Sequence, residues 1–245
     1  MKLQINKNNK IFIAGHNGLV GSSIVRLLKR RGYKNLITKD RFSLNLLDQK
    51  KTKLFFRSER PDNVICAAAK VGGIYANQMQ PGQFLYENLA IQNNLIHFSH
   101  EYGVKHLLFL GSACIYPKYA EQPIKEDSIL SGSLEPTNEP YALAKIAGIK
   151  LCETYFKQYS NNFMSVMPNN LYGPNDNFDP ETSHVIPALV RKFHYAKVNS
   201  MKCVKIWGTG VPLREFLHVD DLAEAMLFII KNVRAEEIYN KGISH

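Results

Sequence analysis

Five short apolar runs, separated by stretches with helical periodicity, limit what this chain can fold into. The runs lie at residues 10–14 (KIFIA), 36–38, 63–69 (NVICAAA), 105–110 (KHLLFL) and 163–167. Short runs of this kind are typical of strands that are buried on both faces of a parallel sheet. Helical spacing of apolar residues follows at residues 22–31, 80–102 and 141–159. This alternation predicts an α/β fold with a doubly wound, Rossmann-like parallel sheet.

Turn-forming residues become frequent after residue 170, for example in the run 173–177 (GPNDN) and at Asp179-Pro180. We therefore predict two parts, a Rossmann-like domain over residues 1–170 and a small substrate-binding portion over residues 171–245. We expect this second portion to be truncated at its C-terminus. An alternative that the sequence leaves open is that part of it re-enters the main sheet.

Charge and cysteine usage narrow the classes of partner. The formal net charge is +10 over 245 residues, but the basic residues are spread along the chain, with small clusters only at residues 29–31 and 50–51. This distribution favours a solvated surface that attracts an anionic small molecule, and we expect no nucleic-acid partner. No apolar run is long enough to span a membrane, and the polar first ten residues do not resemble a signal peptide. The four cysteines are far apart, which predicts no metal site and a reducing, cytoplasmic location.

A glycine-rich loop joins the first strand to the first helix. Glycine allows a tight turn and a close approach of the backbone, and a helix N-terminus favours an anion such as a pyrophosphate. The spacing is GxxGxxG rather than the GxGxxG fingerprint, but the strand before it and the helix after it predict dinucleotide binding. The residues of this candidate cofactor loop are Gly15, His16, Asn17, Gly18, Leu19, Val20 and Gly21.

The second strand ends at Lys39-Asp40-Arg41, where dinucleotide-binding folds place the residue that contacts the ribose. Two cations favour the 2′-phosphate of NADP(H). Asp40 leaves the alternative open, because a carboxylate at this place can bind the 2′-hydroxyl of NAD.

Tyr141 and Lys145 lie four residues apart at the start of a predicted helix and so share one face. A lysine ammonium about 4 Å from a phenol would lower the phenol's pKa by roughly three units at an effective dielectric constant near 20. We therefore expect Lys145 to make Tyr141 a usable proton donor or acceptor. Ser112, at the end of the predicted strand 105–110, could hydrogen-bond a substrate ketone beside it.

These residues, together with residues 214–221 (REFLHVDD), resemble the extended short-chain dehydrogenase/reductases. More narrowly, the chain is similar to the GDP-L-fucose synthase family within them. The supporting segments cover nearly the whole chain and lie at residues 67–77 (AAAKVGGIYAN), 109–118 (FLGSACIYPK), 134–153, 170–178 (NLYGPNDNF), 183–194 and 214–221.

The resemblance implies NADPH-dependent epimerisation at C3 and C5 and reduction at C4 of GDP-4-keto-6-deoxy-D-mannose, which gives GDP-L-fucose. Tyr141 would protonate the C4 oxygen, Lys145 would hold the nicotinamide ribose and Ser112 would bind the ketone. Cys114 and His184 would be the base and acid of the epimerisations. Without the motif, Cys114 would be interpreted as a small buried hydrophobe and His184 as a helix cap or surface residue.

The resemblance also implies binding residues. Arg41 would bind the 2′-phosphate. Further cofactor contacts are implied for Leu110, Gly111, Lys145, Pro168, Asn169, Asn170, Leu171 and His184. The GDP-sugar would be bound by Lys192, Trp207 and Arg214.

Three residues depart from the family pattern, which has arginine at Asn17, serine at Ala113 and arginine at Lys192. The first departure removes a phosphate-binding cation, and the third replaces a two-pronged guanidinium with a point charge. Two alternatives therefore stay open: a C4-reductase of another GDP-4-keto sugar such as a heptose, and a truncated, non-catalytic cofactor-binding relative.

The resemblance further implies a homodimer through the predicted helices 80–102 and 141–159. Both helices carry apolar residues beyond one face, and we expect these to form the contact. The residues are Leu85, Leu89, Ile96, Ile146, Ile149 and Phe156.

Overall fold

A computed structural model describes residues 5–180, 182–206 and 208–242 of the chain. Its centre is a five-stranded, all-parallel sheet in the order β2-β1-β3-β4-β5. The strands are β1 (Ile11–Ala14), β2 (Leu36–Ile37), β3 (Asn63–Cys66), β4 (His106–Leu110) and β5 (Phe163–Val166). The register pairs Ile11 with Leu36 on one side of β1 and with Asn63 on the other. The predicted α/β class with a doubly wound parallel sheet is confirmed.

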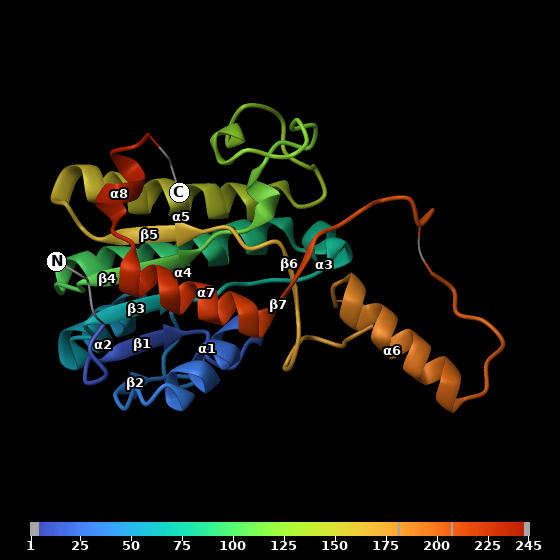
Figure 1. Ribbon diagram of the computed structural model, residues 1–245, viewed down its shortest axis with the longest axis horizontal. Coiled ribbons are helices and arrows are strands. Elements are labelled where there is room, and N and C mark those ends of the chain that lie inside the picture. The colour runs from blue at the N-terminus through green and yellow to red at the C-terminus, as the bar shows by residue number, and fades with distance from the viewer. Residues whose placement is uncertain (1–4, 181, 207, 243–245) are drawn as a thin grey trace.

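Alternating strand residues supply two separate cores, one on each face of the sheet. Helices lie on both sides of the sheet (Figure 1). Phe12, Val64 and Phe109 pack with helices α2 (Gln49–Glu59), α4 (Pro81–Glu101) and α5 (Glu139–Tyr159). On the opposite face, Ile13 and Leu108 pack with α1 (Leu19–Arg30) and with helices from the end of the chain. Because both faces are covered, every residue of β1 and β3 is buried, as the apolar runs predict.

Local signals explain where the long helices begin and end. Pro81 and Pro140 lie in the first turns of α4 and α5, where a missing N–H removes no intrahelical hydrogen bond. Asp48 caps α2 by accepting a hydrogen bond from the Lys51 N–H at 2.9 Å. α5 ends at Ser160, which adopts a left-handed conformation with φ of 57°. The shorter helix α3 (Ile74–Met79) and the 3-10 turns η1 (Ala113–Ile115) and η2 (Glu126–Ser128) lie in the connections.

After β5 the chain leaves the main sheet and later returns to its face. β6 (Asn170–Tyr172) pairs in parallel with β7 (Phe216–His218), and between them α6 (Val185–Val198) stands away from the sheet (Figure 1). The helices α7 (Val219–Asn232) and α8 (Ala235–Tyr239) then pack into the same core as α1. The division of the chain at residue 170 stays a prediction.

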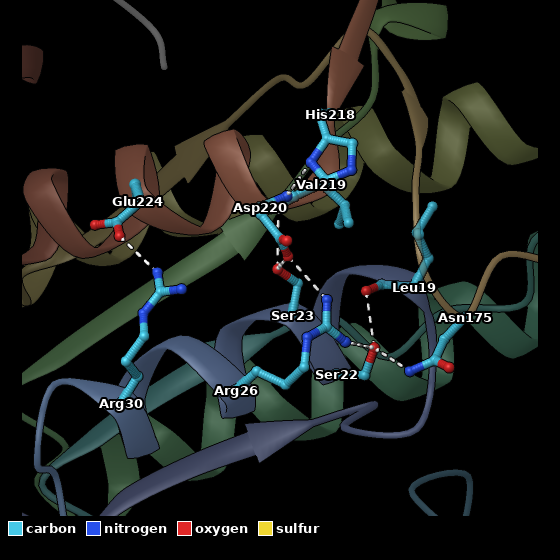
Figure 2. A network of polar contacts seen from close by, with 10 residues as sticks. All are labelled: Leu19, Ser22, Ser23, Arg26, Arg30, Asn175, His218, Val219, Asp220 and Glu224. Carbon is cyan, nitrogen blue, oxygen red and sulfur yellow. Dashed lines mark hydrogen bonds and ion pairs between the residues drawn. The ribbon is translucent and has the colours of Figure 1, made fainter.

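A polar network fastens α7 to α1 (Figure 2). The buried Ser23 hydroxyl donates to the Asp220 carboxylate, which also receives the Arg26 guanidinium at 2.8 Å. Asn175, in the turn after β6, donates its side-chain amide to the Ser22 hydroxyl at 3.1 Å. The network therefore joins the helix that follows the glycine loop to both segments that surround α6.

Three of the six apolar residues expected at a chain–chain contact are buried inside the chain itself, and the other three, Leu85, Leu89 and Phe156, are half-buried. Ile96 and Ile149 have no exposed surface and Ile146 has 6%, so the expectation that they face a second chain is wrong. The reason is that α4 and α5 pack against each other and on the sheet, which covers these side chains. The outer faces of the two helices present Tyr86 and Leu143 to solvent instead.

Within the described residues, no helix has the length and apolar character needed to cross a membrane.

Candidate active site

A cleft of about 720 Å³ opens where the carboxyl ends of β1, β3 and β4 meet. β1 and β3 are neighbours whose connections lead to opposite sides, which is the position where open α/β sheets bind ligands. The glycine loop forms one side of the cleft, and Ser112, Tyr141 and Lys145 lie along another part of its lining. The cleft is thus long enough to bring the predicted cofactor loop and the predicted chemical groups into one continuous space.

The glycine loop is held by close packing at two positions. Gly15 has φ of +84°, and a Cβ there would lie 2.7 Å from the Ala68 backbone nitrogen. A Cβ on Gly21 would lie 2.1 Å from the Gly15 carbonyl oxygen. Gly18 differs, because a Cβ there would meet only the Gly15 oxygen at 3.5 Å and would otherwise fill open cleft. This open cradle at the N-terminus of α1 fits a pyrophosphate.

All residues predicted to contact the cofactor line this cleft. They are Gly15, His16, Asn17, Gly18, Leu19, Val20, Gly21, Arg41, Leu110, Gly111, Lys145, Pro168, Asn169, Asn170, Leu171 and His184. The structure therefore brings together segments that lie more than 150 residues apart in the chain. Their individual roles stay predictions.

The ribose end of the cleft carries Lys39, Asp40 and Arg41. The Asp40 carboxylate accepts the Ser43 N–H at 2.7 Å, and this hydrogen bond lowers the pKa of Asp40. Asp40 therefore already serves as the cap of a local turn. Arg41 has 73% of its side chain exposed and approaches only Glu87, at 3.6 Å, among the ion pairs of the described residues. This arrangement favours the 2′-phosphate interpretation over the 2′-hydroxyl one.

Ser112, Tyr141 and Lys145 form a compact group. Ser112 follows β4 and caps the short turn η1, while Tyr141 and Lys145 lie in the first two turns of α5. The Lys145 ammonium donates to the Leu110 carbonyl at 2.8 Å and lies 5.6 Å from the centre of the Tyr141 ring. The Ser112 side chain lies near enough to Tyr141 to lower the pKa of the phenol. A ketone oxygen bound here would meet a hydroxyl and a phenol together.

The expected effect of Lys145 on Tyr141 is wrong for this structure. Burial raises the pKa of Tyr141 well above its usual value, and the Ser112 side chain opposes this only in part. Burial also lowers the pKa of Lys145 to about 8. The physical reason is that the cleft wall removes both groups from water, which disfavours their charged forms. Tyr141 therefore remains a protonated phenol at neutral pH.

Cys114 lies beside this group but does not line the cleft. It packs against the core on the α4–α5 face of the sheet, and its backbone N–H donates to the Ser112 hydroxyl oxygen at 3.5 Å. Burial raises the pKa of its thiol, while Ser112 and Lys145 act in the opposite direction. To act as a base, the thiol must overcome this burial with help from those two neighbours.

His184 lies across the cleft at the start of α6. It occupies the N-cap position, but its side chain makes no capping hydrogen bond and is exposed. A hydrogen bond from the Gly73 N–H to the Thr182 carbonyl, at 3.0 Å, ties this segment to the loop after β3. The imidazole is therefore free of the capping role and faces a space shared with Tyr141.

Of the three residues predicted to bind the GDP-sugar, the structure describes two, and it brings neither of them to this cleft. Neither Lys192, on α6, nor Arg214, before β7, lines it. The Lys192 ammonium instead approaches the Lys205 carbonyl at 3.4 Å, and the Arg214 guanidinium donates to the Leu213 carbonyl. Trp207 lies outside the described residues. The roles of all three stay predictions.

Sequence reasoning missed three charged residues of the cleft, Lys70, Glu87 and Asp176. Lys70 follows β3, so the rule that ligand-binding residues follow parallel strands could have found it. Glu87 lies within α4, and no local signal distinguishes it from a surface glutamate. Among the described residues, no cluster of three or more histidine, cysteine or acidic side chains could hold a metal ion.

Comparison with known proteins assigns the chain to a family. Residues 11–242 match the model of the NAD dependent epimerase/dehydratase family. The chain is 58% identical to GDP-L-fucose synthase 1 of Arabidopsis thaliana, with 96% of this chain and 73% of that protein covered. It is 57% identical to the GDP-L-fucose synthase of Escherichia coli K12, over 91% of this chain and 69% of that protein.

A solved structure of a related protein has the same fold as this chain. The structure of a GDP-D-glycero-L-gluco-heptose synthase from Campylobacter jejuni, in the presence of NADPH, superposes with a TM-score of 0.90 at 38% identity. The superposition covers 97% of this chain and 78% of the C. jejuni chain. The chain belongs to the NAD dependent epimerase/dehydratase family and, within it, to the group of the GDP-L-fucose synthases.

Proposed function

We propose that the chain converts GDP-4-keto-6-deoxy-D-mannose to GDP-L-fucose, by epimerisation at C3 and C5 and NADPH-dependent reduction at C4. The observation that carries this proposal is the grouping of Ser112, Tyr141 and Lys145 in the cleft that begins at the glycine loop. Identity of 57–58% to proteins named GDP-L-fucose synthase supports the choice of substrate.

The cleft fits NADP(H) at three points: the open cradle at Gly18, the cation Arg41 at the ribose end, and Lys145 at the other end. The C. jejuni heptose synthase, whose structure was determined with NADPH, supports this cofactor. When bound, NADPH supplies the hydride that reduces the C4 ketone. Lys145, fixed by the Leu110 carbonyl, is in position to hold a ribose hydroxyl.

Reduction needs a proton at the C4 oxygen. The raised pKa of Tyr141 suits this direction of the reaction, because a phenol that keeps its proton at neutral pH can donate it to an alkoxide. The Ser112 hydroxyl, which lies beside Tyr141 in the cleft, orients the ketone oxygen toward the phenol.

Epimerisation needs a base and an acid near C3 and C5, whose protons are acidified by the C4 ketone. We assign the base to Cys114 and the acid to His184. Ser112 and Lys145 lower the pKa of the Cys114 thiol against the larger effect of burial. The exchange of C3 and C5 protons should therefore quicken as the pH rises and the thiolate becomes more abundant.

Two variants separate the chemistries. Tyr141→Phe should lower NADPH oxidation by about a hundredfold or more, the usual contribution of general acid catalysis, yet retain exchange of the C3 and C5 protons with deuterated water. Cys114→Ser should lose the exchange and reduce the unepimerised sugar. NMR of the products measures both, after NADPH titration has shown that each variant binds the cofactor. Full exchange in Cys114→Ser would show that another group is the base.

A second candidate is a C4-reductase that does not epimerise, acting on this sugar or on another GDP-4-keto sugar such as a heptose. The position of Cys114 outside the cleft lining favours it, as does the 39% identity to a protein named GDP-mannoheptose C4 reductase from C. jejuni. Reduction by the wild-type chain without any solvent exchange would select this candidate.

The chain is further proposed to act as a homodimer in the cytoplasm. The outer faces of α4 and α5 expose Tyr86 and Leu143, which supports a contact between two copies there. All four cysteines are free, in agreement with a reducing compartment.

A further inference from the structure

Glu87 lies between two cations in the wall of the cleft. Its carboxylate is 3.3 Å from the Lys70 ammonium and 3.6 Å from the Arg41 guanidinium. Only 17% of the Glu87 side chain is exposed, compared with 23% for Lys70 and 73% for Arg41. The carboxylate is thus a nearly buried anion at the place where an anionic ligand would meet Arg41.

The two cations are held very differently. Lys70 also donates to the Gln83 side-chain oxygen at 2.9 Å, and its backbone is bracketed by Asn88, which accepts from its N–H and donates to its carbonyl. Lys70 is therefore a fixed partner that stabilises Glu87 by itself. Arg41 is mostly in solvent, and its ion pair with Glu87 is long, so the guanidinium can leave without exposing an unpaired buried charge.

We propose that Glu87 tunes the cofactor specificity of the cleft by competing with the 2′-phosphate of NADP(H) for Arg41. NADH has no 2′-phosphate, so when NADH binds, Arg41 keeps its ion pair with Glu87. With NADPH, Arg41 must exchange Glu87 for the phosphate, and Glu87 then repels the phosphate from close range. Glu87 therefore narrows the preference for NADPH over NADH. This inference rests on the proposed binding of NADP(H).

Two features of the same region support this role. Asp40 uses its Oδ1 oxygen to accept the Ser43 N–H, which holds this carboxylate in a local turn. Asn17, on the glycine loop in the same cleft, brings no charge. A 2′-phosphate at this end of the cleft would therefore meet the cations Lys39 and Arg41 and the buried anion Glu87.

The test is direct binding of NADPH and NADH, followed by nicotinamide fluorescence, to the wild-type chain and to Glu87→Gln. Glutamine keeps the size of the side chain and can still accept a hydrogen bond from Lys70. NADPH should bind about three- to tenfold more tightly to the variant, the effect of removing one like charge across a partly hydrated gap, while NADH changes less than about twofold. The gain should shrink between 0.1 M and 1 M salt, where the screening length falls from about 10 Å to about 3 Å.

Glu101→Gln is the matched control. Glu101 lies on the same helix and forms an ion pair with Lys53 at 2.8 Å, but it is not part of the cleft lining. It should leave both affinities unchanged. If Glu87→Gln does not fold, Lys70→Gln tests the same idea with the opposite sign, because freeing Glu87 from Lys70 strengthens its hold on Arg41. The ratio of NADPH to NADH affinity should then fall.

The outcomes separate this inference from the function that it rests on. If NADPH binds the wild-type chain but Glu87→Gln changes neither affinity, or changes both equally, Glu87 does not tune specificity and the proposed function stands. If neither nucleotide binds the folded wild-type chain, the role of Glu87 and the proposed function are both overturned. A gain for NADPH that disappears when Arg41→Gln is added to Glu87→Gln would establish that the two residues act as one pair.

Discussion

Tyr141 and Lys145 show how strongly burial sets the charge of a single residue. Four-residue spacing on a helix suggests that a lysine charge would stabilise a phenolate. In the folded chain, Lys145 is 4% exposed and binds the Leu110 carbonyl, and removal from water disfavours the charged form of both side chains. The pair is better suited to donate a proton to a substrate than to accept one from it.

Lys145→Met should remove a pH-dependent contribution to the free energy of unfolding. Burial lowers the pKa of Lys145 from 10.5 to about 8. Between these values the unfolded chain binds a proton that the folded chain does not, so this contribution rises with pH through the window and is lost as the pH falls. At about 1.4 kcal/mol per pKa unit, wild type should gain on the order of 3 kcal/mol over the variant between pH 7 and pH 10.5.

Urea titrations at several pH values measure this difference. Lys150→Met is the matched control, since Lys150 lies on the same helix and pairs with Glu153 at 2.8 Å near the surface. It should keep the wild-type pH profile. A constant difference between wild type and Lys145→Met at every pH would mean that Lys145 is not titrating in this window.

At the scale of elements, α7 is attached to α1 by one inner and one outer contact. The inner contact is Asp220 with the buried Ser23 and with Arg26, and the first of these lowers the pKa of Asp220 most. The outer contact is Glu224 with Arg30 and Arg31, all of them substantially exposed. Because α1 begins at the glycine loop, these contacts also connect the loop's helix to the strand pair β6–β7 (Figure 2).

Asp220→Ala and Glu224→Ala should therefore differ although both remove an acidic residue from α7. The first leaves the buried Ser23 hydroxyl with only the Val219 carbonyl at 3.3 Å, so it should lower the free energy of unfolding by about 1–3 kcal/mol. The second breaks exposed ion pairs, worth about 0–1 kcal/mol. Urea midpoints of the two variants measure the contrast. Equal losses would mean that the Ser23–Asp220 hydrogen bond contributes nothing beyond a surface charge.

The sequence predicts those helices and strands whose signal lies within the element's own residues. The strands from β1 to β5 and the helices α1, α4 and α5 follow from apolar runs and helical spacing, and the structure confirms them. The six-residue α3 is too short to show a period. The pairing of β6 with β7 joins residues about 45 apart, and only the folded chain shows that partnership. The same reason explains Glu87, whose role depends on Arg41 and Lys70 from two other segments.

At the scale of the whole molecule, the two faces of the sheet are covered by different sets of helices. α1 and α7 cover one face, and α4 and α5 cover the other (Figure 1). The buried residues Ile96, Ile146 and Ile149 bind α4 and α5 to the sheet, so any contact with a second copy must use the outer surface of these helices. Tyr86 on α4 is 69% exposed and Leu143 on α5 is 42% exposed. Such side chains suit the centre of a contact between identical helical faces.

A homodimer through these helices should be broken by a charge on its surface. In an isologous contact each substitution occurs twice, so Tyr86→Glu or Leu143→Glu places two carboxylates in one interface. We expect wild type to sediment as a dimer at micromolar concentration and each variant to sediment as a folded monomer. Phe228→Glu is the matched control, because Phe228 is 64% exposed on α7, on the opposite side of the sheet, and should leave the dimer intact. A monomeric wild type, or dissociation caused by Phe228→Glu alone, would show that α4 and α5 are not the interface.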